Sequence, residues 1–306
     1  MSSNRGGSTR SRTAWLLLAA LTACWASAFT FTAMALKGIS PEWVVVFRQL
    51  IAALMLFPLA LKLGTLHEVP RAAWGWLAAL GIVGNVAPFY VISWGQQHIE
   101  SGLAAIFITT MPLMTLALAH VFVPGERMTA RRLAGFVTGL AGVALIVGPE
   151  VLFDVGISDL ELLAQAAVLF GAVLFAANAI IARNMPAMDL WGRSAYTSGI
   201  AFIVILPLAL ATTPLPDAMP GAQSLLGIIG TGIFATGLAT VIYYRLIDEA
   251  GPTFMSMTNY LVPPVALVAG IVVLGESPSI WALLGLALIL VGIAVAELKW
   301  GKRAVE

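Results

Sequence analysis

Apolar residues run along this chain in long stretches, and short groups of charged or turn-forming residues separate one stretch from the next. A helix that crosses a bilayer needs roughly 20 mainly apolar residues. The pattern predicts ten such helices, with short connections between them. Their expected ranges are 14–36, 43–61, 72–95, 102–122, 130–148, 160–182, 190–211, 223–246, 253–274 and 279–297. We therefore expect an all-α membrane protein with no inserted soluble domain.

Composition supports this prediction and excludes several function classes. Of the 306 residues, 60% are hydrophobic and 10% are charged, whereas a soluble domain has roughly 25% charged residues. The net charge of +1 and the lack of a long basic tract argue against nucleic acid as a partner. The single cysteine, Cys24, and three scattered histidines exclude a disulfide framework and give no obvious metal site, so we expect neither metal nor cofactor.

Lysine and arginine fall mainly on one side of the predicted membrane. Cytoplasmic loops carry an excess of these residues, and 14 of the 16 lie in alternate connections or at the chain ends. Both termini are therefore expected in the cytoplasm, and the alternation favours an even number of spans. Arginine outnumbers lysine 12 to 4, and alanine and leucine dominate, which indicates a bacterial inner membrane.

The start of the chain permits another interpretation. Three arginines, an apolar run and the triplet 26–28 (Ala-Ser-Ala) together resemble a cleavable signal peptide. The apolar stretch continues past that triplet to Leu36, however, which is longer than a signal core. Cleavage would also leave nine spans, so we expect a retained first helix.

The second half of the chain repeats the first at an offset of 150 residues. Gly125 and Glu126 match Gly275 and Glu276. Five more identities follow at the same offset: Leu133 with Leu283, Gly135 with Gly285, Leu140 with Leu290, Gly142 with Gly292 and Ala144 with Ala294. Each half, 1–149 and 150–306, then holds five spans. Because five is odd, the halves must be inverted, as in many secondary transporters with a solute site near the midplane.

A family resemblance rests on short motifs in both halves. The first half carries Ser101-Gly102-Leu103-Ala104-Ala105, Met111-Pro112-Leu113, Gly125-Glu126-Arg127, Gly135 and Gly142, and the first helix carries Cys24-Trp25-Ala26-Ser27-Ala28-Phe29. The second half carries Ala250-Gly251-Pro252, Val262-Pro263, Gly275-Glu276, Gly285 and Gly292. This pattern resembles the EamA-type drug/metabolite transporter superfamily, and within it most nearly the YddG-type exporters of aromatic and other amino acids. The resemblance implies ten helices, export and a metabolite-like solute. Ala26 departs from the glycine that the family often has there.

Prolines interrupt equivalent predicted helices. Pro112 lies in the fourth span, and Pro263 with Pro264 lies in the ninth. A proline inside a helix frees the carbonyl four residues earlier, and proline-interrupted segments at matching positions of two halves point to a transport site. Pro88 is a further candidate break, in the third span. The alternative is that these prolines only kink packed helices.

Polar and aromatic residues near these breaks are the candidate solute ligands. They come from spans one, two, three, four, six, eight and nine: Trp25, Ser27, Arg48, Asn85, Tyr90, Trp94, Thr109, Asn178, Thr240, Tyr243, Ser256, Asn259 and Tyr260. Neutral amides and hydroxyls with aromatic walls suit an amino acid or a similar solute. Interhelical hydrogen bonds and anchoring at the headgroups are the structural alternatives. Asn259 is the foremost single candidate, because it is polar and lies beside a predicted break.

Charged residues are nearly absent from the spans. Arg48 is the exception, and it could reach the interface, a helix C-terminus or a solute carboxylate. No Asp or Glu lies inside a predicted span, which disfavours proton coupling through an embedded carboxylate and favours a uniporter. Glu126 and Glu276 are expected to stabilise the starts of the fifth and tenth helices. Gly135 and Gly139 form a small face that could join two halves or two protomers.

Together these observations predict a transporter that exports small metabolites, most simply neutral or aromatic amino acids. Its expected partners are a small solute and the lipid bilayer, with a monomer as the working state. A nucleotide-sugar or sugar-phosphate antiporter is the alternative within transport, although phosphate usually needs more cations than Arg48 alone. An intramembrane enzyme is disfavoured, because no nucleophile, base or group of metal ligands falls at one depth.

Overall fold

The structure is a computed structural model that describes residues 11–66, 69–123, 125–152, 158–214 and 219–297. Within these ranges every element of secondary structure is a helix. Eight helices are long and apolar enough to cross a membrane, and two shorter apolar helices, Thr258–Leu274 and Ile280–Ala296, follow them. The all-helical, multi-pass prediction is therefore confirmed, and these apolar helices fall within or close to the predicted ranges.

Six of these apolar segments are uninterrupted α-helices. They are α1 (Arg12–Ala35), α2 (Pro41–Lys62), α7 (Ala130–Leu152), α8 (Asp159–Asn184), α9 (Leu190–Thr212) and α14 (Ile280–Glu297). Side chains that accept backbone N–H groups define several of their starts. Ser11 accepts from Ala14, Ser158 accepts from Glu161, and Asp189 accepts from two backbone N–H groups of the first turn of α9.

Four further apolar segments are each built from several pieces. The third along the chain comprises α3 (Arg71–Gly81), η1 (Ile82–Val86) and α4 (Ala87–Gly95), and the eighth comprises α10 (Ala222–Ile229), η2 (Gly230–Leu238) and α11 (Ala239–Ala250). Here η marks a π-helical turn, and η1 shifted by 150 residues falls inside η2. Such turns often occur at functional sites. Both halves of the molecule thus widen the helix at the same place.

The fourth and ninth spans are broken, but not in the same way. The fourth comprises α5 (Ser101–Ile108) and α6 (Met111–Phe122), with the break at 109–110 directly before α6, whose second residue is Pro112. The ninth comprises α12 (Pro252–Met255), α13 (Thr258–Ala269) and η3 (Gly270–Leu274), with the break at 256–257.

The prolines explain only part of this pattern. Pro112 lies in the first turn of α6, where a missing N–H has little effect. Pro88 is the second residue of α4, which directly follows the π-helical turn η1, and the helix continues through it, so the break expected at Pro88 is not present. Pro263 and Pro264 lie inside α13, which runs through them without a break. The expectation of a break at Pro263 and Pro264 is therefore not met. Membrane helices tolerate interior prolines when neighbouring groups satisfy the freed carbonyls.

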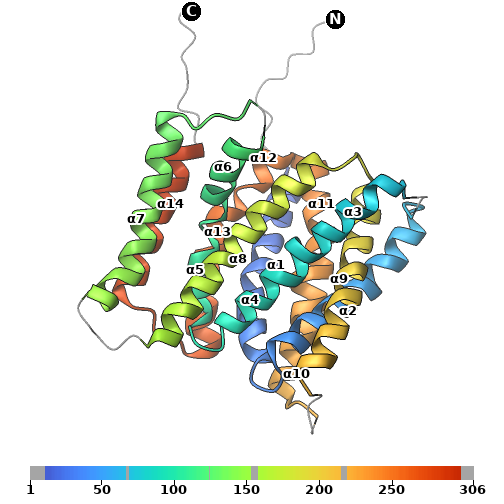
Figure 1. Ribbon diagram of the computed structural model, residues 1–306, viewed down its shortest axis with the longest axis horizontal. Coiled ribbons are helices and arrows are strands. Elements are labelled where there is room, and N and C mark those ends of the chain that lie inside the picture. The colour runs from blue at the N-terminus through green and yellow to red at the C-terminus, as the bar shows by residue number, and fades with distance from the viewer. Residues whose placement is uncertain (1–10, 67–68, 124, 153–157, 215–218, 298–306) are drawn as a thin grey trace, which may run out of the picture.

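Helices α7 and α14 pack side by side at one edge of the molecule (Figure 1). Their glycines meet in pairs. A Cβ atom on Gly142 would lie 2.8 Å from the carbonyl oxygen of Gly285, and one on Gly292 would lie 2.6 Å from that of Gly135. Residue numbers rise along one helix as they fall along the other, so the two helices are antiparallel. The glycine face of span five therefore joins the two halves of this chain.

The same antiparallel arrangement recurs between α2 and α9. Trp43 donates to the carbonyl of Pro214 at one end, and Gly192 lies against the carbonyl of Thr65 at the other. Equivalent helices of the two halves also make equivalent contacts: α1 packs on α10, η2 and α11, and α8 packs on α3, η1 and α4. The packing thus has an approximate twofold symmetry between the two halves.

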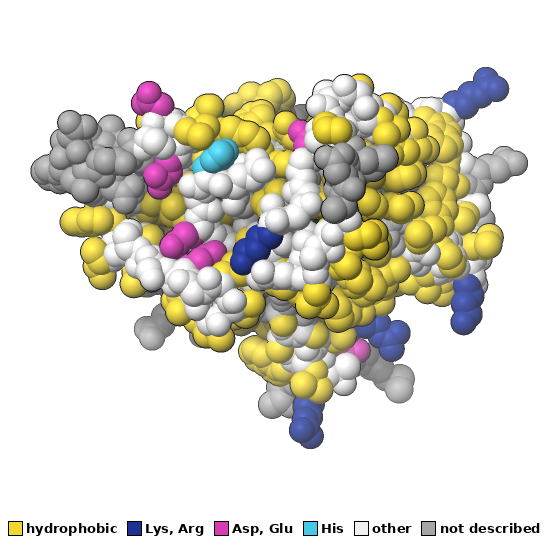
Figure 2. Space-filling view, turned by 90° about the horizontal axis from the view of Figure 1, so that it is seen from below, with side chains coloured by type: hydrophobic (Ala, Val, Ile, Leu, Met, Phe, Trp, Pro, Cys, Tyr) yellow, Lys and Arg dark blue, Asp and Glu magenta, His cyan; other side chains and the backbone are white. Residues whose placement is uncertain are grey.

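The flanks of the molecule are hydrophobic. Figure 2 shows a mainly apolar flank around a face that is white and charged at its centre. Large apolar side chains such as Leu54, Leu61, Val121, Ile203 and Val272 are more than half exposed. Side chains of this kind are stable when they face lipid, so the surface fits a multi-pass membrane protein.

Candidate functional site

A cavity of about 420 Å³ lies between the two halves and receives side chains from both. Ten of the residues that the sequence singled out line it. They are Trp25, Arg48, Asn85, Thr109, Pro112, Asn178, Thr240, Tyr243, Asn259 and Pro263. The π-helical turn η1 contributes Asn85, and η2 contributes Ala235 and Thr236. Both turns therefore border the cavity.

Seven of the predicted residues do not line this cavity: Ser27, Pro88, Tyr90, Trp94, Ser256, Tyr260 and Pro264. Ser27 donates to the carbonyl of Cys24 in its own helix, at 3.0 Å. Trp94 packs edge-on against His98, with ring centroids 5.2 Å apart. Tyr90 and Tyr260 pack against hydrophobic clusters. The helical periodicity identified the right helices, but in these cases it selected a neighbouring face.

Several lining residues were absent from the predicted set. The polar and aromatic ones are Phe29, Thr32, Phe89, Gln96, Phe175, Ser194, Thr236 and Tyr244. Two of them could have been found, because Asn85, Phe89 and Gln96 share a helical face at i, i+4 and i+11. Ser194 could not, since it lies near the start of α9 and reaches the cavity only through tertiary packing with Tyr244.

Arg48 is the one charged side chain among the described residues that line the cavity. It lies within α2 and is only 5% exposed. Its Nε donates to the hydroxyl of Thr236 at 2.8 Å, and its Cζ lies 3.6 Å from the centre of the Phe89 ring. Thr236 in turn donates to the carbonyl of Thr231 at 2.9 Å. The guanidinium is thus fixed by one hydrogen bond and one cation–π contact.

Aromatic rings form two walls of the cavity. Phe89 and Phe175 meet edge-on, with centroids 5.6 Å apart. Trp25 and Tyr243 lie 5.9 Å apart, and Tyr243 also contacts Tyr244, which is hydrogen-bonded to Ser194. Rings of this kind accept a flat or aliphatic body without a fixed orientation.

Neutral amides supply acceptors. Asn85 donates its amide nitrogen to the carbonyl of Leu80 at 3.2 Å, and Gln96 donates to the carbonyl of Phe29 at 3.0 Å. The side-chain oxygens of Gln96 and Asn178 are buried and have no hydrogen-bond partner in the structure. Orphaned acceptors of this kind are uncommon and are stabilised when a donor reaches them.

On the side of the molecule where α4 ends, a carboxylate ties the two halves together. Glu276, in the connection before α14, accepts from the backbone N–H groups of Ser101 and Gly102 at 2.7 and 2.9 Å. Glu100 accepts reciprocally from the N–H of Ser277 at 3.1 Å. We call the group formed by Glu100, Ser101, Gly102, Glu276 and Ser277 the Glu276 clasp. The expectation that Glu276 stabilises the start of its own helix is wrong, because it caps α5 of the other half.

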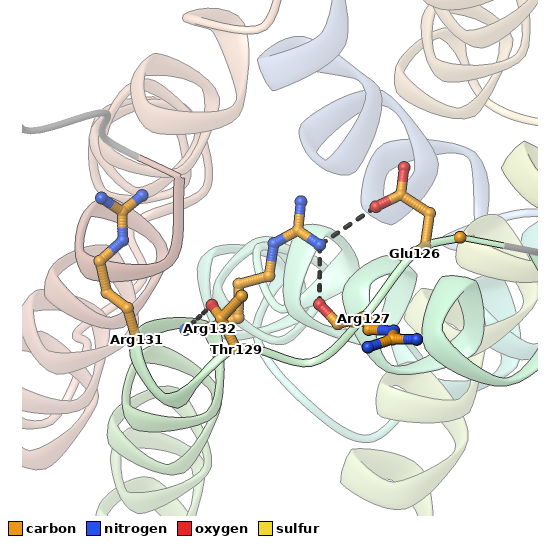
Figure 3. Close-up of a pocket in the computed structure, with 6 residues that line it drawn as sticks. Glu126, Arg127, Thr129, Arg131 and Arg132 are labelled. Carbon is orange, nitrogen blue, oxygen red and sulfur yellow. Dashed lines mark hydrogen bonds and ion pairs between the residues drawn. The ribbon is translucent and has the colours of Figure 1, made fainter. Parts of the chain in front are cut away.

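The equivalent carboxylate on the opposite side, Glu126, has different partners. It accepts from Arg132 at 3.1 Å and from Arg183 at 3.2 Å. Hydrogen bonds from Arg132 and then Arg183 hold the pKa of the Glu126 carboxyl below its ordinary value. Figure 3 shows Arg132 reaching both Glu126 and the carbonyl of Arg127, while Arg131 points away.

The hollow around these residues spans about 620 Å³ but lies on the surface, and its acid is already neutralised. It is therefore a weaker solute site than the cavity between the halves. Throughout the described ranges, no group of three or more His, Cys, Asp or Glu side chains could hold a metal ion.

Comparison with known proteins places this architecture in a family. The profile of the EamA-like transporter family matches residues 12–148 and again 162–297. The chain is 30% identical over 289 residues to the "Probable terminal-alkyne amino-acid exporter" of Streptantibioticus cattleyicolor, covering 92% of each chain. It is also 26% identical to "Uncharacterized transporter YoaV" of Bacillus subtilis (75% of each) and 24% to "Protein PecM" of Dickeya dadantii (89% and 88%).

A solved crystal structure has the same fold. It matches with a TM-score of 0.62 and 18% identity over 93% of this chain and 97% of the other, a likeness that concerns the fold alone. The family profile accounts for nearly all the described helices and matches both halves separately. The chain therefore belongs to the EamA-like transporter family, as a membrane protein with two copies of its repeat.

Proposed function

We propose that this protein exports small metabolites, most simply neutral or aromatic amino acids, by alternating access through the cavity between the two repeats. The observation that carries the proposal is the lining of that cavity. Both halves contribute aromatic walls, neutral amides and hydroxyls, and the only charge among the described lining residues is Arg48. Such a lining suits a solute with an apolar body and a few polar groups.

The relatives support the solute class. One of them carries a name that says it exports a terminal-alkyne amino acid, and it aligns with 92% of this chain. A terminal-alkyne amino acid combines a carboxylate and an ammonium with an apolar side chain. The aromatic pairs Phe89 with Phe175 and Trp25 with Tyr243 would accept such a side chain.

The proposal includes a topology of ten spans in two inverted sets of five, with both termini in the cytoplasm of a bacterial cell. The antiparallel pairing of α7 with α14 and of α2 with α9 supports inversion. In that orientation the Glu276 clasp lies on the outer side, where it would hold the two halves together while solute enters from the cytoplasm.

Uniport is the simplest mode. No Asp or Glu is found among the described residues that line the cavity. A proton-coupled antiporter of the embedded-carboxylate kind needs such a group where solute and proton compete. We therefore propose that the solute gradient alone drives transport.

The test is uptake of labelled aromatic and aliphatic amino acids into liposomes that contain the purified protein, with and without a pH gradient. We expect saturable uptake without a gradient. Asn259→Ala should weaken it, because Asn259 lines the cavity, and the exposed Asn184→Ala on α8 should leave it unchanged. Failure to transport any amino acid would overturn the solute class, and strict dependence on the pH gradient would overturn uniport.

A further inference from the structure

We propose that Arg48 anchors the carboxylate of the solute and thereby makes the cavity selective for carboxylate-bearing molecules over amines and amides. This inference rests on the proposed function and gives it a chemical criterion. Its first support is that Arg48 is buried within α2 and borders the cavity. A charge in such a place is unfavourable unless something compensates it.

The protein itself supplies no compensating anion. Among the described residues, the ion pairs within 4 Å are those that Glu126 makes with Arg132 and Arg183, far along the chain from Arg48. The described lining of the cavity holds no other charged side chain. An isolated buried cation beside an open cavity therefore lacks a counter-ion, which a bound solute would provide.

The contacts that Arg48 does make leave its binding edge available. Nε is used on Thr236 and one face of the guanidinium is used on Phe89. For the two terminal nitrogens, the structure records no hydrogen bond to any described residue. Those nitrogens form the planar fork that binds a carboxylate with two parallel hydrogen bonds. Thr236 and Phe89 thus act as positioning residues for the fork.

The hydroxyl of Thr236 is itself oriented. It donates to the carbonyl of Thr231 in η2, so its lone pairs are left to accept from Nε. The π-helical turn η2 therefore places Thr236 within hydrogen-bond distance of the guanidinium. A substitution that removes only this hydroxyl should loosen the fork without removing the charge.

Arg48 disfavours cationic solutes that carry no carboxylate. A positive group would meet only neutral acceptors, such as the unpartnered oxygens of Gln96 and Asn178, and aromatic faces. Those groups tolerate the ammonium of a zwitterion when Arg48 neutralises its carboxylate. An amine without a carboxylate would leave two positive charges in one cavity, a repulsion that low polarity strengthens. A single cation also suits a carboxylate better than a doubly charged phosphate.

The experiment compares four molecules of one shape: L-phenylalanine, 3-phenylpropionate, phenylalaninamide and phenethylamine. Binding is read as the rise in melting temperature of the detergent-purified protein, and transport as uptake into liposomes. With wild-type protein we expect the two carboxylates to bind at least tenfold more tightly than the amide and the amine. Phenyl phosphate is included, and tighter binding of phosphate than of carboxylate would overturn the proposal.

Variants of Arg48 make the test specific. Arg48→Gln should raise the KM for phenylalanine at least tenfold and remove the preference for carboxylates, because a charge-assisted hydrogen bond is lost. Arg48→Lys should be intermediate, since it keeps the charge without the planar fork. Lys62→Gln, at the exposed end of the same helix, should behave as wild type.

Variants of Thr236, the positioning residue, keep the inference testable if the Arg48 variants do not fold. Thr236→Val should raise KM by a smaller factor while kcat changes little, and Thr236→Ser should restore it. If Arg48→Gln discriminates among the four molecules as wild type does, the inference is wrong even though the protein transports amino acids. Carboxylate binding without any uptake would instead contradict the proposed function and support the inference. Absence of both would overturn the two together.

Discussion

Glu276 and Glu126 occupy matching positions in the two repeats, but their carboxylates have different partners. Glu276 reaches across the halves and caps two backbone N–H groups of α5. Glu126 pairs with the side chains of Arg132 and Arg183. The same dipeptide, Gly-Glu, thus connects one end of the molecule through backbone hydrogen bonds and the other through partly exposed ion pairs.

The sequence contains a reason for the difference. Ser101 and Gly102, which donate to Glu276, correspond at the offset of 150 to Gly251 and Pro252. Proline has no N–H, and the N–H of Gly251 is already used on the carbonyl of Ile247, at 2.8 Å. Glu126 consequently has no pair of backbone donors at the equivalent place. The helix packing is symmetric between the halves, whereas the proline at position 252 leaves the two ends of the molecule unequal.

The largest effect should come from Glu276→Gln. The neutral amide would weaken two charge-assisted hydrogen bonds, and we expect a loss of about 3 kcal/mol in the free energy of unfolding. Thermal unfolding of the purified protein measures it. Glu126→Gln is the matched control and should lower the melting temperature less. Equal effects of the two substitutions would remove the distinction between the ends.

A glycine in the symmetric part of the interface should come next. Gly285→Ala would place a Cβ 2.7 Å from the carbonyl oxygen of Gly142 and against Ile146. Overpacking of this kind costs about 1 to 3 kcal/mol, so the melting temperature should fall. Gly75→Ala meets nothing within 4 Å and should be neutral or stabilising. A harmless Gly285→Ala would contradict the close packing of α7 and α14.

A smaller effect should follow from Pro252→Ala, which restores the missing N–H at the weaker end. If Glu126 takes up this donor, Glu126→Gln will lower the melting temperature more in the Pro252→Ala background than in wild type. The double-mutant cycle isolates that coupling. Strict additivity would show that the proline is not what keeps Glu126 from capping.

The smallest effect concerns pH. Arg132 and Arg183 lower the pKa of Glu126 in the folded protein, so its ion pairs stabilise the fold above the ordinary carboxyl pKa of 4.5. That stability is lost as the pH falls through the folded value. The difference in melting temperature between wild type and Glu126→Gln should be constant from pH 6 to 8 and shrink below pH 4.5. Because these side chains are partly exposed, added salt should also reduce the difference. A difference that grows in acid would contradict the assignment.

Much of the fold could be predicted from the sequence, because span length and hydropathy are local properties. The all-helical, multi-pass architecture follows from them, and the two copies of the repeat follow from the residues that match at an offset of 150. Pro112 marks the break in span four correctly, since a proline begins a helix well. Pro263 and Pro264 mislead, because whether a freed carbonyl finds a partner depends on neighbouring helices.

The cavity was harder to predict than the fold. Arg48, Asn85, Asn178 and Asn259 line it as their residue types suggested. Which face of a helix meets the cavity depends on the rotation of that helix about its axis and on the π-helical turns. For this reason Phe89 lines the cavity, whereas its neighbour Tyr90, the predicted ligand, does not. The role of Glu276 could not be inferred from its own helix, because its partners lie 174 and 175 residues away.

If the solute occupies the cavity between the halves, it should protect a thiol placed there from modification. Thr240→Cys, in a Cys24→Ser background, puts one thiol in the cavity, and Met219→Cys puts one on an exposed connection as a control. Both would be treated with a membrane-impermeant thiol reagent, with and without L-phenylalanine. We expect phenylalanine to slow modification at position 240 and not at position 219. Equal modification of Thr240→Cys with and without phenylalanine, in protein that transports phenylalanine, would contradict this placement of the solute.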